Sequence, residues 1–78
     1  MIAFRDVMQR VKEVIQQTSK KEKILDRDIA NALHLDPQYF AVIKRRNKIP
    51  YESLAYFCKD HRINMNWILL DQVPSHLT

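Results

Sequence analysis

The sequence predicts an all-α domain of five helices, and three observations favour this fold class. Glycine is absent from the 78 residues, which argues against hairpins built on Asn-Gly or Asp-Gly turns. Apolar side chains recur at intervals of three and four residues, the spacing of amphipathic helices. Helix-start signals divide this pattern at Asp36-Pro37, at Pro50 and at Asn64. A chain of this length forms one domain, so the helices are expected to share one compact core.

The first two helices are predicted mainly from apolar spacing. Residues 2–17 carry one apolar stripe, formed by Phe4, Val7, Met8, Val11, Val14 and Ile15. Residues 18–23 are polar and are expected to connect the two helices. Asp26 is the expected N-cap of the second helix, which is short and turns Ile29, Ala30 and Leu33 inward.

Proline and asparagine define the remaining helices. Asp36 caps a third helix and Pro37 fits its first position, so this helix runs to about Arg46. Asn47 is expected to end it, because Asn tolerates left-handed backbone better than most residues.

A fourth helix opens at Pro50, and a fifth is capped by Asn64 and continues through Leu70. In the fifth helix, Trp67 and Leu70 are expected to close the core. Residues 1–71 are then the folded domain, and residues 72–78 a tail or the start of a linker.

Composition argues against several classes of function. Without glycine there is no P-loop, dinucleotide fingerprint or nucleophile elbow. The single cysteine forms no internal disulfide, and Cys58 and His61 supply only half of a zinc site. Ser19, Ser53 and Ser75 show no local arrangement with a base that would support nucleophilic catalysis. We therefore expect no enzymatic activity, no cofactor, no metal and no small-molecule substrate. The apolar runs are too short to span a membrane, and the expected location is the cytoplasm.

The positive charge is concentrated in one segment. The net charge is +4, from 13 basic and 9 acidic residues. Removing Lys44, Arg45, Arg46 and Lys48 leaves nine basic residues, which balance the nine acids. This segment either complements the dipole at a helix end or binds a polyanion.

The second and third helices are separated only by His34, Leu35 and Asp36. Two short helices joined by so few residues cross steeply, as in a helix-turn-helix. Phe40 and Ile43 anchor the third helix inward. Its outer surface then carries Gln38, Tyr39, Ala41, Val42, Lys44 and Arg45.

Residues 26–71 resemble the helix-turn-helix domain of phage CI-type repressors, in the lambda repressor-like DNA-binding superfamily. The resemblance lies in three stretches that occur in order: DIANAL at 28–33, IKRRNKIPY at 43–51 and NMNWIL at 64–69. His34, Asn47 and Arg62 stand where the family commonly has glycine. Asp26 stands where the family often has Gln or Thr touching phosphate, so that contact is not transferred. At Arg62 a different turn is expected.

The resemblance implies a sequence-specific regulator of transcription, a repressor of double-stranded operator DNA. Its third helix would enter the major groove and meet the base edges. Base contacts are expected from Gln38, Ala41, Val42 and Arg45. Backbone contacts are expected from Tyr39, Lys44, Arg46 and Lys48.

A homodimer is expected, because one half-site reader of this size binds weakly. The dimer contact is expected near the last helix, at Ile68, Leu69 and Val73. The alternative is that the apolar residues of this helix cover the base of the first helix. An alternative function keeps the fold without the operator contact, as an antirepressor-like or adaptor module that binds protein and holds DNA only weakly. Asp26 and the apolar residues Ala41 and Val42 leave room for it.

Overall fold

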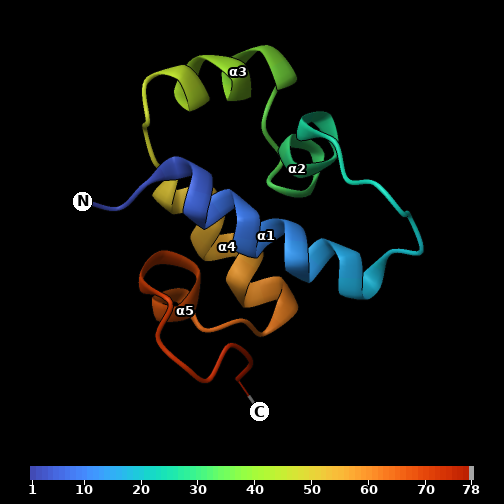
Figure 1. Ribbon diagram of the computed structural model, residues 1–78, viewed down its shortest axis with the longest axis vertical. Helices are drawn as coiled ribbons and strands as arrows, with labels where there is room; N and C mark the ends of the chain where they lie inside the picture. Colours follow the sequence, from blue (N-terminus) through green and yellow to red (C-terminus); the bar gives the residue numbers. More distant parts are fainter. Residues whose placement is uncertain (78) are drawn as a thin grey trace.

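The computed structural model describes residues 1–77, and within them the chain forms five α-helices and no strand (Figure 1). The expected all-α class is confirmed. The helices are α1 (Phe4–Thr18), α2 (Asp26–Ala32), α3 (Pro37–Arg45), α4 (Tyr51–His61) and α5 (Met65–Leu70). In the view of Figure 1, α1 crosses the middle of the molecule, with α2 and α3 above it and α5 below.

The core forms around the apolar stripe of α1. Val7, Val11 and Val14 are at most 2% exposed, and each of the other four helices contributes buried side chains. Through them α1 packs against α2 and α5, while α2 packs against α3. Among residues 1–77 no polar or charged residue is buried. The fold therefore depends on apolar burial, with polar groups acting at the helix ends.

Two helix starts were predicted correctly in chemical detail. Asp36 caps α3: its Oδ1 accepts hydrogen bonds from the backbone N–H groups of Gln38 at 2.7 Å and Tyr39 at 3.3 Å. Asn64 caps α5, accepting from the N–H of Asn66 at 3.0 Å. Both side chains satisfy N–H groups that have no partner within their own helix.

The start of α2 differs from the prediction. Asp26 is the first helical residue and Leu25 precedes the helix, so Asp26 is not the N-cap. Asp28 provides the polar contact instead, because its Oδ2 accepts from the backbone N–H of Leu25 at 2.8 Å. A carboxylate three residues into a helix can reach back in this way, as in half of a capping box.

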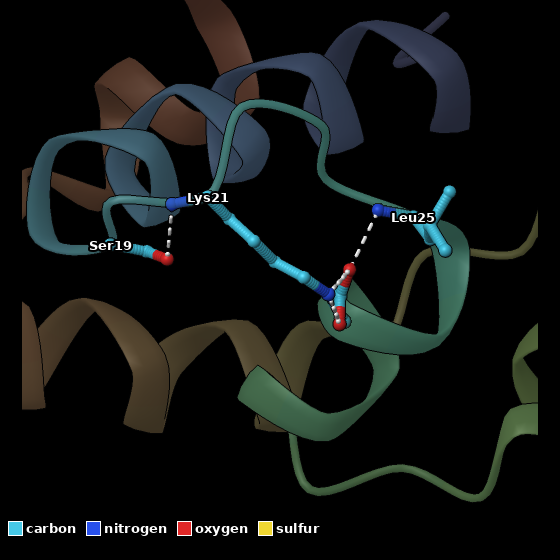
Figure 2. A network of polar contacts seen from close by, with 4 residues as sticks. Ser19, Lys21 and Leu25 are labelled. Atoms are coloured by element: carbon cyan, nitrogen blue, oxygen red, sulfur yellow. Dashed lines mark hydrogen bonds and ion pairs between the residues drawn. The ribbon is translucent and has the colours of Figure 1, made fainter.

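Asp28 also fixes the connection between α1 and α2 (Figure 2). The Nζ of Lys21 lies 2.9 Å from both of its carboxylate oxygens. Earlier in the connection, the Oγ of Ser19 accepts from the backbone N–H of Lys21 at 3.2 Å. The backbone bond from Leu25 and the Lys21 ammonium lower the pKa of the Asp28 carboxyl. The ionised form of Asp28 therefore stabilises this connection.

We expect Asp28→Asn to lower the unfolding temperature at pH 7, because the amide cannot pair with Lys21 in the same way. A lowered pKa in the folded state makes a contribution that is present above about pH 4 and lost as pH falls through the folded value. Thermal unfolding followed by circular dichroism should show the parent and the variant converging below that pH. A difference that is constant from pH 7 to pH 2 would contradict this role.

Three helices end in the same way although the chain has no glycine. His34, Asn47 and Arg62 have φ of 57°, 52° and 56°, in the left-handed region. In each case the residue's own N–H bonds to the carbonyl three residues earlier. The next N–H bonds to the carbonyl five residues before it, as in Lys48 N to Ile43 O at 2.9 Å. This is the Schellman pattern. The prediction of a different turn at Arg62 is wrong, because the turn there has the same left-handed backbone and the same pair of hydrogen bonds as the turns at His34 and Asn47.

Left-handed backbone disfavours a residue such as Arg by about 1–2 kcal/mol, whereas glycine adopts it freely at an entropic cost. We expect Arg62→Gly to raise the free energy of unfolding by about 0.5–1 kcal/mol, a rise of a few degrees in Tm. Ala55→Gly, at an exposed position inside α4, is the matched control and should lose about 1 kcal/mol. Urea unfolding measures both. Loss of stability in both variants would contradict the left-handed assignment of Arg62.

Residues 75–77, within the segment expected to be a tail or the start of a linker, fold back onto the domain. The backbone N–H of Leu77 bonds to Arg62 O at 2.8 Å, and that of Asn64 bonds to Ser75 O at 2.8 Å. These bonds surround an isolated antiparallel bridge between Ile63 and His76. Thr78, the last residue of the expected tail, lies outside the described residues.

Candidate nucleic-acid interface

Helix α3 has one buried face and one exposed face. Phe40 and Ile43 are 2% and 1% exposed and hold the helix on the core. Gln38, Ala41 and Arg45 are all exposed. Their spacing of three and four residues puts them on the same side of a helix. Three of the four expected base-contacting residues therefore form one accessible row.

The fourth expected base-contacting residue, Val42, is half-buried, so it presents only part of its side chain. Tyr39 is 46% exposed, near the start of the same helix. Of the remaining expected contacts, Lys44 lies in the last turn of α3, while Arg46 and Lys48 follow the helix. All three are exposed.

The four cations of this segment do not have equal electrostatic surroundings. The Nζ of Lys44 lies 2.6 Å from the Oδ2 of Asp26, the first residue of α2. Within residues 1–77, Arg45, Arg46 and Lys48 have no ion pair. The C-terminal end of α3 thus presents three uncompensated positive charges beside one that is paired.

Asn47 fixes this basic end to α1. Its Oδ1 accepts from the backbone N–H of Phe4 at 2.7 Å. Phe4 is the first residue of α1, and the preceding Ala3 has no side chain that can cap it. The rings of Phe4 from α1 and Phe40 from α3 also pack against each other, with their centroids 5.3 Å apart. The position of α3 on the domain is therefore set by a polar contact at its end and an aromatic contact along its length.

A cleft of about 360 Å³ lies beside the basic end, lined by residues of α1, α2 and α3. Arg5 and Lys12 of α1 line it together with Lys44 and Asp26, while Phe40 is one of its apolar residues. Arg5 and Lys12 were not predicted to be part of the basic surface. Their position near α3 depends on how α1 crosses the other helices, and no local pattern indicates it.

The expected dimer contact needs correction at Ile68. This side chain is fully buried, at 0% exposure, because α5 turns it toward the core. Its carbonyl accepts from Nη1 of Arg10 on α1 at 2.9 Å. Leu70, expected to close the core, is instead 53% exposed, while Trp67 and Leu69 are half-buried against it.

Val73, also expected at the dimer contact, is 84% exposed. Of the three residues assigned to that contact, Val73 and part of Leu69 are thus accessible.

Residues outside α3 offer little reactive chemistry. Cys58 is buried, and desolvation raises the pKa of its thiol to about 11, so it stays neutral near pH 7. The nearby His61 ring packs on Phe57, with ring centroids 4.3 Å apart. Over residues 1–77 no group of three or more His, Cys, Asp or Glu side chains could hold a metal ion. None of the described helices combines the length and apolarity needed to cross a bilayer.

Comparisons of this chain with protein-family models, with curated protein sequences and with solved structures found no match. Its function is therefore inferred from the exposed face of α3 and the charges around it.

Proposed function

We propose that this protein is a sequence-specific double-stranded DNA-binding regulator of transcription, of the phage repressor type, with α3 as its reading helix. One observation carries the proposal: an exposed helix face with Gln38 near its start continues into the uncompensated cations Arg45, Arg46 and Lys48. A face of this kind combines groups that read bases with groups that neutralise phosphates.

The dimensions of α3 suit the major groove. An α-helix with its side chains is about 10–12 Å across, and the groove is about 12 Å wide. Gln38 would pair with adenine through N6 and N7, and Ala41, with the exposed part of Val42, would contact a thymine methyl. Arg45 would pair with guanine from the far end of the same row. The exposed row would thus read bases from Gln38 to Arg45, while Arg46 and Lys48, which follow the helix, stay close to the backbone.

The remaining contacts would hold the helix in register. Arg46 and Lys48 follow α3 and would reach phosphates on either side of the groove, with Lys44 as a third cation. Tyr39 would donate its hydroxyl to a phosphate. Each phosphate neutralised steepens the slope of log affinity against log salt concentration by about 0.9. Arg5 and Lys12 extend the positive surface along the cleft beside α3.

The resemblance to lambda repressor-like domains gains support from the helix ends. His34, Asn47 and Arg62, at the three positions where that family commonly has glycine, all have left-handed backbone in this chain. His34 lies in the four-residue connection between α2 and α3, the turn of the proposed helix-turn-helix. The same backbone geometry is thus built here from residues that adopt it less readily.

The proposal includes a homodimer on a two-fold symmetric operator, because a dimer bound to two half-sites binds more tightly than one domain bound to one half-site. Val73 and the accessible part of Leu69 remain the proposed contact, and the exposed Leu70 is added to them. Ile68 has no part in it.

Charge reversal at the end of α3 tests the DNA contact. We expect Arg45→Glu and Arg46→Glu each to weaken duplex binding about tenfold or more, since a contact becomes a repulsion. Lys59→Glu, on the exposed surface of α4, makes the same change of net charge and should bind nearly as the parent does. Fluorescence anisotropy with circular dichroism controls measures both. Equal losses of DNA affinity in all three variants would mean that only the net charge of the protein matters, which would contradict a contact at the end of α3.

Selection from a random duplex pool at physiological salt tests sequence reading. We expect a palindromic motif whose half-sites are about 10 bp apart, or a multiple of that spacing. Gln38→Ala should relax the preference for adenine at one position of each half-site. Failure to enrich any motif would contradict the operator-binding proposal and favour the adaptor alternative.

A further inference from the structure

The ion pair between Asp26 and Lys44 joins the first residue of α2 to the last turn of α3. The two side chains are 59% and 55% exposed, so the 2.6 Å contact forms in water. An exposed pair of this kind exchanges readily for another partner because its net stability is small. Lys44 also belongs to the segment proposed to meet DNA phosphates.

Asp26 makes no capping hydrogen bond at the start of α2. Its side chain accepts no backbone hydrogen bond at the helix start, and its one ion-pair partner among the described residues is Lys44. Asp28, two residues later, holds the backbone of Leu25 and the ammonium of Lys21. Asp28 therefore makes the polar side-chain contacts that stabilise the start of α2.

We infer that Asp26 limits DNA binding by competing with phosphate for Lys44, an inference that rests on the proposed function. In the free protein the carboxylate neutralises Lys44. On DNA, a phosphate at Lys44 must displace that carboxylate or lie close to its negative charge. Asp26 thereby lowers the affinity for any duplex. Lys44, at the end of α3, contributes less to that affinity than it would without the Asp26 carboxylate.

Asp26→Asn tests the inference, because the amide keeps the size of the side chain and removes its charge. We expect the affinity for a random-sequence 20 bp duplex to rise about two- to fivefold. This is the change in binding constant that corresponds to the free energy of an exposed ion pair. The slope of log affinity against log salt should steepen by up to about 0.9, as one more phosphate is neutralised. Asp60→Asn, an exposed acid on α4, is the control for net charge.

A double-mutant cycle with Lys44→Ala separates competition from simple repulsion. If Asp26 acts through Lys44, the gain from Asp26→Asn falls to that of the Asp60→Asn control when Lys44 is absent. Lys44→Ala should likewise cost more affinity in the Asp26→Asn background than in the parent. Asp26→Ser serves as a second neutral variant, and circular dichroism checks that each one folds.

Two results would overturn the inference: no gain of affinity in either neutral variant, or an equal gain with and without Lys44. Failure of the proposed function gives a different pattern. In that case Arg45→Glu and Arg46→Glu bind duplex DNA as the parent does, whatever happens at Asp26.

Discussion

The position of α3 relative to α1 depends on the side chain and backbone of Asn47. Its left-handed backbone ends α3, and its Oδ1 accepts from the first N–H of α1, 43 residues earlier. One residue thus satisfies the ends of two helices that are far apart in sequence. Because the basic residues 44–48 surround it, their position relative to α1 follows from this contact. A glycine here would supply the backbone conformation without the cap.

A chain without glycine has to end its helices by other means, and three of the five described helices do so in the same way. His, Asn and Arg occupy the left-handed positions after α2, α3 and α4, and the paired backbone bonds there satisfy carbonyls that the helices leave open. Each such residue opposes folding slightly. The buried apolar core, to which all five helices and their connections contribute within residues 1–77, offsets that cost.

Local signals predicted much of the fold, and long-range contacts account for what they missed. Asp36 and Asn64 were identified as caps because capping involves residues only two or three positions apart. The choice for Ile68 between a dimer contact and a contact with the first helix stayed open, since six residues of α5 are too few for a periodic pattern to show which side meets α1. The exposed row on α3 followed from the burial of Phe40 and Ile43. The Asp26–Lys44 pair joins residues 18 positions apart, so only the packing of α2 on α3 reveals it.

The two ends of the chain lie at different distances from α3, and this decides how the protein can be attached to other objects. Met1 contacts Asn47, with Sδ 3.7 Å from Nδ2, so the N-terminus lies beside the basic end. The C-terminal segment is held near α4 and α5 by its bonds to Arg62 and Asn64, on the opposite side of α1 in Figure 1. A fluorophore, sensor surface or fused domain joined through the C-terminal end leaves α3 accessible, whereas the same object at the N-terminus crowds it.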